Sequence, residues 1–188
     1  KLIGIVREDN DNIVKLKGKQ LHPHELVRTF FGEPSEAETL ILQSQWASMK
    51  EGVIESMQNI EQGALDLGKL VPLVDVSGSM SGTPMEVAIA LGILVSEVNH
   101  PDFRNRFITF ESKPRWVTLD ETWSLAEKVN HTRQAPWGGS TDLSAALNMI
   151  YEVVEAKKLP IEDIPGLIIF SDMQFNPVSY THLTLPTI

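Results

Sequence analysis

The residues best suited to chemistry in this chain are clusters of carboxylate and hydroxyl side chains next to apolar runs. The pattern Asp75-x-Ser77-x-Ser79 follows one such run, the polar loop 137–142 precedes a predicted helix, and Asp172 follows another run. Carboxylate and hydroxyl oxygens are hard donors, which suit Mg²⁺, Mn²⁺ or Ca²⁺ better than a soft metal. These clusters therefore predict a site for a divalent cation.

Each cluster also has a purely structural interpretation. A serine after a strand commonly caps a helix or forms a turn. Asp142 can cap the helix that follows it, and Asp172 can start a turn. Asp75 is harder to explain in this way, because an acid at the end of a buried strand costs several kcal/mol unless it is paired or bound to a metal. The prediction of a cation site therefore rests mainly on Asp75.

The elements that must position these clusters alternate between strands and helices, which predicts an α/β fold with a mainly parallel sheet flanked by helices. In such sheets, ligands bind beyond the carboxyl ends of the strands. A capping box of Thr83 and Glu86 is expected to start the helix after Asp75. The predicted strands are 70–76, 106–110, 115–118 (antiparallel to the one before it) and 166–170.

The segment before this domain has a helical pattern. Pro23 begins one helix that ends at Gly32, and a capping box of Ser35 and Glu38 begins a second helix. We predict a connector over 1–19, the end of a helical region and a linker over 20–68, an α/β domain over 69–177, and an atypical tail over 178–188. The tail has no Asp, Glu, Lys or Arg, so we interpret it as a foreign segment.

Composition excludes several classes of protein. The 188 residues are 42% hydrophobic and 22% charged, with a formal net charge of −9. The absence of cysteine excludes thiol catalysis, zinc fingers and iron–sulfur clusters, and it fits an intracellular, cytoplasmic protein. Residues 70–188 carry 14 acidic and 8 basic side chains, which argues against sequence-blind binding of nucleic acid by this part. No apolar run is long enough to span a bilayer, so no membrane partner is expected.

The pattern Asp75-Val76-Ser77-Gly78-Ser79 resembles the DxSxS element of von Willebrand factor A (vWA) domains, whose fold is Rossmann-like. Thr141 and Asp172 stand where that family supplies its remaining ligands. The resemblance implies a metal-ion-dependent adhesion site (MIDAS). In such a site the serines and the threonine bind the cation through hydroxyls, the aspartates bind directly or through water, and one position stays open for an acidic group of the partner.

Further motifs lie at His22–Glu25, Gln45–Trp46, Asp75–Met80, Gly82–Val87 and Phe170–Met173. Together they resemble a poorly characterised vWA-containing family of plants, fungi and large viruses. That family is similar in architecture to the Ro autoantigen (TROVE) family, in which a vWA domain closes a helical-repeat ring that binds RNA. The resemblance implies that 69–177 is a vWA domain truncated at its C-terminus.

The function that follows from these features is a divalent-metal-dependent binding module without catalytic activity. Mg²⁺, Mn²⁺ or Ca²⁺ would bind a protein partner that supplies a carboxylate. The resemblance to the Ro family leaves open a ribonucleoprotein role instead, in which RNA contacts the upstream helical region. The oligomeric state stays open. The expected metal ligands are Asp75, Ser77, Ser79, Thr141 and Asp172.

The alternative function is a magnesium-dependent phosphatase or phosphotransferase with Asp75 as its nucleophile. Such enzymes usually carry a second aspartate two residues later as a general acid. Ser77 occupies that position here and cannot perform that role. The sequence therefore favours the binding module.

Overall fold

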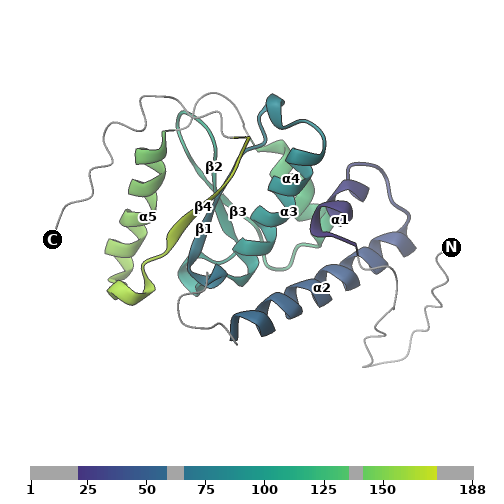
Figure 1. The fold of residues 1–188 in the computed structure, drawn as a ribbon. Helices are drawn as coiled ribbons and strands as arrows, with labels where there is room; N and C mark the ends of the chain where they lie inside the picture. The colour runs from purple at the N-terminus through teal and green to yellow at the C-terminus, as the bar shows by residue number, and fades with distance from the viewer. Residues whose placement is uncertain (1–20, 59–65, 136–141, 173–188) are drawn as a thin grey trace.

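The protein is described from a computed structural model that defines residues 21–58, 66–135 and 142–172. The predicted connector 1–19 and the tail 178–188 lie outside these residues. The described elements are helices and strands mixed along the chain (Figure 1). In chain order they are α1 (Pro23–Thr29), α2 (Glu36–Gln58), β1 (Leu70–Val74), α3 (Thr83–Val98), β2 (Arg106–Thr109), β3 (Trp116–Thr118), α4 (Leu125–Gln134), α5 (Leu143–Lys157) and β4 (Gly166–Phe170).

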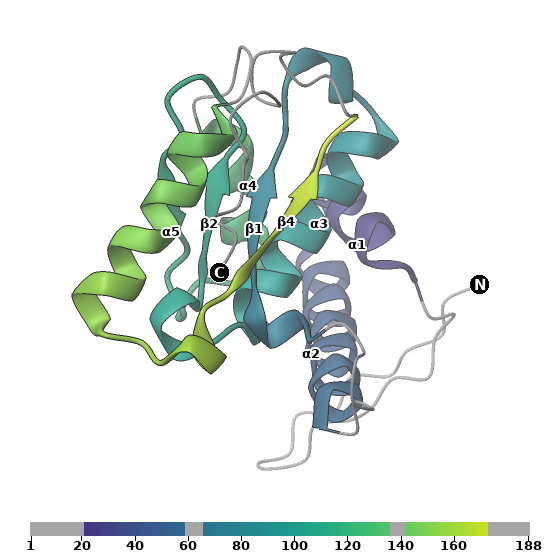
Figure 2. The same cartoon turned by 60° about the vertical axis from the view of Figure 1, so that its left-hand side comes forward.

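The four strands form one mixed sheet in the order β3-β2-β1-β4. Strand β1 is parallel to β2 and to β4, whereas β3 is antiparallel to β2, as the sequence predicted. Val74 at the end of β1 pairs with Thr109 of β2 and Phe170 of β4, so the three parallel strands end at the same edge (Figure 2). The predicted mainly parallel α/β fold is confirmed at this level.

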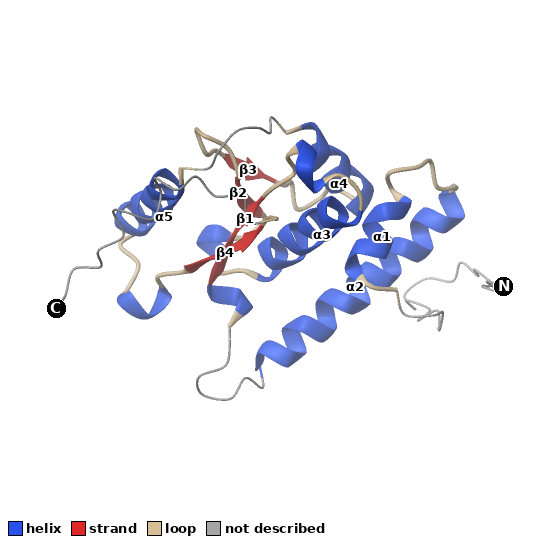
Figure 3. Ribbon diagram, turned by 45° about the horizontal axis from the view of Figure 1, so that its top comes forward, coloured by secondary structure: helices blue, strands red, loops and turns tan. Residues whose placement is uncertain are grey.

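Helices cover both faces of the sheet (Figure 3). Alternate residues of β1 point to opposite faces, so Leu73 packs in the cluster with α5, whereas Val74 packs in the cluster with α3. Helix α3 is buried on almost every side because it lies between the sheet and the helices outside it. None of the described helices is both long and apolar enough to cross a membrane.

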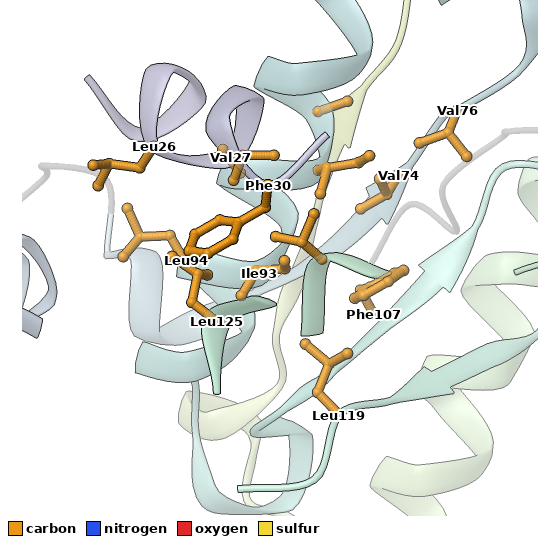
Figure 4. Packing of buried hydrophobic residues seen from close by; sticks show 14 of the residues in the cluster. Leu26, Val27, Phe30, Val74, Val76, Ile93, Leu94, Phe107, Leu119 and Leu125 are labelled. Carbon is orange, nitrogen blue, oxygen red and sulfur yellow. The ribbon is translucent and has the colours of Figure 1, made fainter. Parts of the chain in front are cut away.

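Helices α1 and α2 share the hydrophobic core of the α/β part. Leu26 and Val27 of α1 are fully buried, and they belong to the same cluster as Ile93 of α3, Phe107 of β2 and Leu125 of α4 (Figure 4). The two helices therefore pack as a layer on α3 and α4.

A buried polar contact holds α2 in this layer. The Trp46 indole Nε1 donates to Glu97 Oε2 at 2.9 Å, and Lys128 Nζ lies 2.5 Å from Glu97 Oε1. The Glu97 and Lys128 side chains are only 4% and 7% exposed, so their charges are compensated within the fold. One carboxylate thus joins α2, α3 and α4.

The predicted capping boxes had different outcomes. At α2, the Ser35 backbone N donates to Glu38 Oε2, and the Glu38 backbone N donates to Ser35 Oγ, as predicted. The box at α3 was wrong, because Gly82 precedes the helix as its N-cap and no side chain caps it. Glu86 instead binds a side chain of α1.

Candidate functional site

Asp75 is the first residue after β1 and lies at the edge where the parallel strands end. Its backbone N donates to the Phe170 carbonyl oxygen at 2.9 Å, which continues the pairing with β4 by one residue. The residue is only 1% exposed. The strand therefore places a carboxylate inside the protein at the position where α/β folds bind ligands.

Both carboxylate oxygens of Asp75 accept hydrogen bonds. The Ser77 backbone N donates to Oδ1 at 2.8 Å, and Ser171 Oγ donates to Oδ2 at 2.8 Å. Within residues 21–58, 66–135 and 142–172, no Lys, Arg or His forms an ion pair with Asp75. Neutral donors orient this carboxylate without supplying a positive charge.

The segment 75–82, which we call the site loop, brings two hydroxyls close together. Ser77 Oγ and Ser79 Oγ lie 3.0 Å apart, and both serines are more exposed than Asp75. Met80 anchors the loop because its side chain is 3% exposed and packs in the core. Gly82 ends the loop with φ of 88°, a left-handed conformation that favours glycine.

The structure describes one of the two other predicted metal ligands, Asp172. Asp172 is exposed and directly follows Ser171, so β4 brings it to the same edge as the site loop. Thr141 lies outside the described residues. The described part of the chain contains no group of three or more His, Asp or Glu side chains placed to hold a metal ion. The donors at this edge are therefore a mixture of carboxylates and hydroxyls.

Asp142 has the structural role that its position before a helix allowed. Its Oδ1 accepts a hydrogen bond from the Ala145 backbone N at 2.9 Å, which caps α5. This contact satisfies one of the free N–H groups in the first turn of the helix. Asp142 is thus a capping residue in this structure.

Sequence reasoning missed Ser171 as a member of the site. Its hydroxyl joins the end of β4 to Asp75 across 96 residues of sequence. Because Val74 pairs with Phe170, the residues that follow each strand, Asp75 and Ser171, face each other. The apolar runs show where the strands end, but the sequence does not show that β1 and β4 are neighbours.

Sequence reasoning also missed a buried acid at the end of β2. Glu111 is 8% exposed, and Arg115 donates to both of its oxygens, from Nε at 2.9 Å and from Nη2 at 3.0 Å. Thr109 Oγ1 donates to Glu111 Oε1 at 2.7 Å. These bonds, chiefly those from Arg115, lower the pKa of Glu111. Unlike Asp75, this acid has a cationic partner.

An apolar groove of about 560 Å³ lies beside the site, between the start of α3 and the end of β4. Its lining includes Met80 from the site loop together with Ser171 and Asp172. The groove thus opens next to the polar cluster.

The family of the chain comes from comparison with known proteins. A family model described as a domain of unknown function (DUF7788) matches residues 70–185, which is more than half of the chain. The chain belongs to the DUF7788 family. The DUF7788 match begins at β1 and includes every described residue of the site.

This membership corrects the family expected from the sequence. The matching model is DUF7788 and not the von Willebrand factor A domain, so the resemblance to vWA domains was wrong. It depended on a few short motifs, and Asp, Ser and Gly, which make up most of the Asp75–Ser79 pattern, are also common turn residues after a strand. The sheet is moreover mixed, with β3 antiparallel, so a Rossmann-like vWA fold is not established.

One relative is an uncharacterised protein of Acanthamoeba polyphaga mimivirus. It is 43% identical over 163 residues, which cover 86% of this chain and 27% of the viral protein. The chain therefore spans about a quarter of the length of this relative. No solved structure matches the chain.

Proposed function

We propose that the site loop and the end of β4 hold a divalent cation, and that the chain is a cation-dependent binding module. The observation that carries this proposal is Asp75, a carboxylate 1% exposed, with hydrogen-bond donors on both oxygens and no cationic partner among the described residues. A buried carboxylate is costly unless a positive charge compensates it. A bound cation would supply that charge.

The residues near Asp75 fit a hard cation. Ser77 and Ser79 offer hydroxyl oxygens 3.0 Å apart, and Asp172 offers an exposed carboxylate at the same edge. Mg²⁺ commonly binds through one or two carboxylates and keeps other positions for water or a ligand. We propose Thr141 as a further ligand, from the sequence alone. Because Asp75 is buried, we expect it to act from beneath the cation, directly or through water.

A cation held in this way can bind a partner reversibly. The described ligands leave room in its coordination shell, so a carboxylate of a partner protein could complete that shell. The burial of Asp75 also disfavours the alternative of a phosphotransfer enzyme, because a nucleophile must contact its substrate. The same partner could belong to a ribonucleoprotein, which the experiment below distinguishes.

Capture of partners from cell extract tests this function. The immobilised chain would be compared in Mg²⁺ and in chelator, beside the variants Asp75→Ala and Asp120→Ala. Asp120 is a matched control, because its Oδ1 also accepts a hydrogen bond from the backbone N two residues later, at Thr122, but it is exposed and lies outside the site.

We expect a set of proteins that binds in Mg²⁺ and is lost in chelator and with Asp75→Ala, but not with Asp120→Ala. Loss of this set after ribonuclease treatment would indicate a ribonucleoprotein partner. Equal capture in Mg²⁺ and in chelator would overturn the proposal.

A further inference from the structure

Arg28 of α1 binds side chains at the start of α3. Arg28 Nε donates to Glu86 Oε2 at 2.7 Å, and Arg28 Nη2 donates to Thr83 Oγ1 at 3.0 Å. Thr83 and Glu86 are three residues apart, so they lie on the same side of the first turn of α3. The Arg28 guanidinium therefore binds two side chains of this turn.

Arg28 supplies the positive charge that compensates the Glu86 carboxylate. Its side chain is 9% exposed and its carboxylate does not cap α3, whereas the Arg28 side chain is 51% exposed. Without Arg28, the carboxylate would stay in a desolvated position without the cation that faces it. The first turn of α3 would then be expected to shift or loosen.

The site loop leads directly into the first turn of α3. Ser79 lies four residues before Thr83, and Gly82, the last residue of the loop, has φ of 88° and directly precedes the helix. Strand β1 fixes the near end of the loop at Asp75, so the start of α3 determines where the two serine hydroxyls can lie. A shift of that turn would move Ser77 and Ser79 relative to Asp75.

Apolar contacts of α1 reinforce this arrangement. Val27 and Phe30 are 0% and 4% exposed, and they pack in the same cluster as Met80 of the site loop and Ile89 of α3. Figure 4 shows Val27 and Phe30 of α1 beside α3, in the cluster that also contains Val74 and Val76. Polar and apolar side chains of α1 thus both contact the residues that adjoin the site loop.

We infer that Arg28 is a positioning residue for the site loop, through which docking of α1 regulates cation affinity. This inference rests on the proposed cation site. By thermodynamic linkage, any factor by which docked α1 strengthens cation binding is also the factor by which the cation strengthens α1 docking. The helical segment would then control the site without touching the cation.

The first test is the affinity for Mn²⁺ of the chain and of Arg28→Ala, measured well below the unfolding temperature. We expect Arg28→Ala to weaken binding by about fivefold or more, which is the lower end of usual coupling factors. Arg28→Lys should restore part of this loss, since it keeps the charge opposite Glu86. Lys157→Ala is the control, because Lys157 at the end of α5 is 58% exposed and pairs with Asp102, away from the site loop.

The second test needs no cation. The Met80 and Ser81 backbone N–H groups donate to the Ser77 and Gly78 carbonyl oxygens within the site loop. Amide hydrogen exchange at these two positions should be faster in Arg28→Ala than in the wild type, and unchanged in Lys157→Ala.

The outcomes separate the inference from the function on which it rests. A wild-type chain that binds no Mn²⁺ would overturn the proposed cation site and, with it, the regulatory role of Arg28. Unchanged Mn²⁺ affinity or unchanged loop exchange in Arg28→Ala, with only a lower unfolding temperature, would overturn the inference alone and leave Arg28 a structural residue.

Discussion

At the scale of single residues, buried carboxylates in this protein differ in how their charge is compensated. Glu86 faces Arg28, Glu97 faces Lys128, and Glu111 faces Arg115. Asp75 receives hydrogen bonds from a backbone N–H and a hydroxyl, with no cation beside it in the described part of the chain. This contrast is the reason to expect a bound cation at Asp75 and not at the other three acids.

Glu111 should make the stability of the fold depend on pH. Because Arg115 lowers its pKa below the ordinary 4.5, the folded state binds a proton at Glu111 less readily than the unfolded state does. Its contribution is therefore present above about pH 4.5 and is lost as the pH falls through the lower pKa of the folded protein. Glu111→Gln should lower the free energy of unfolding at pH 7, and the difference from the wild type should shrink in acid.

Urea unfolding at a series of pH values measures this effect. Glu152→Gln on α5 is the control, because Glu152 is exposed. A constant difference between the wild type and Glu111→Gln from neutral pH down to acid would contradict the assignment.

At the scale of elements, α3 packs directly on β1 because of a glycine. A Cβ atom added at Gly92 would lie 2.5 Å from Val74 Cγ2, which is closer than atoms can approach without a shift. Val74 is fully buried in the central strand, and its branched side chain has little freedom to move. This close approach sets the distance between the helix that follows the site loop and the strand that precedes it.

We predict opposite effects for two alanine substitutions of helical glycines. Gly92→Ala should destabilise the fold by about 1–3 kcal/mol, because overpacking outweighs the better helix propensity of alanine. Gly52→Ala in α2 should stabilise it by about 0.4–1 kcal/mol, because nothing lies within 4 Å of the added Cβ. Urea unfolding of both variants measures this, and equal shifts in the same direction would contradict the packing described here.

The ends of the elements show which features sequence can predict. The box of Ser35 and Glu38 was predicted correctly, since it needs only contacts within four residues. The box at Thr83 was predicted wrongly, because Glu86 has a stronger partner in Arg28, 58 residues earlier in the chain. Local patterns can be read from sequence, but a distant competitor for the same side chain cannot.

At the scale of the whole molecule, the helices before residue 60 and the α/β part share one core. The sequence predicted a mainly parallel α/β fold from its apolar runs, and it placed Asp75, Ser77, Ser79 and Asp172 at the ends of strands. It could not predict the order of the strands, and therefore not the contact of Asp75 with Ser171. Nor could it predict that α1 packs on α3, because both helices simply show apolar faces.

The helical segment α1–α2 is part of the structure that contains the candidate site. The DUF7788 match begins at residue 70, whereas the match with the viral relative covers 86% of the chain. The contacts of α1 and α2 with α3 and α4 make them part of the same folded unit. The folded unit that contains the candidate site therefore includes residues on both sides of residue 70.

The measurement that tests the central claim most directly is a titration with Mn²⁺, followed by the electron paramagnetic resonance signal of the free ion. The account predicts that the wild type and Asp120→Asn each bind one cation per chain, and that Asp75→Asn binds it at least about tenfold more weakly. Binding of Mn²⁺ by Asp75→Asn with wild-type affinity, or no binding by the wild type, would contradict it.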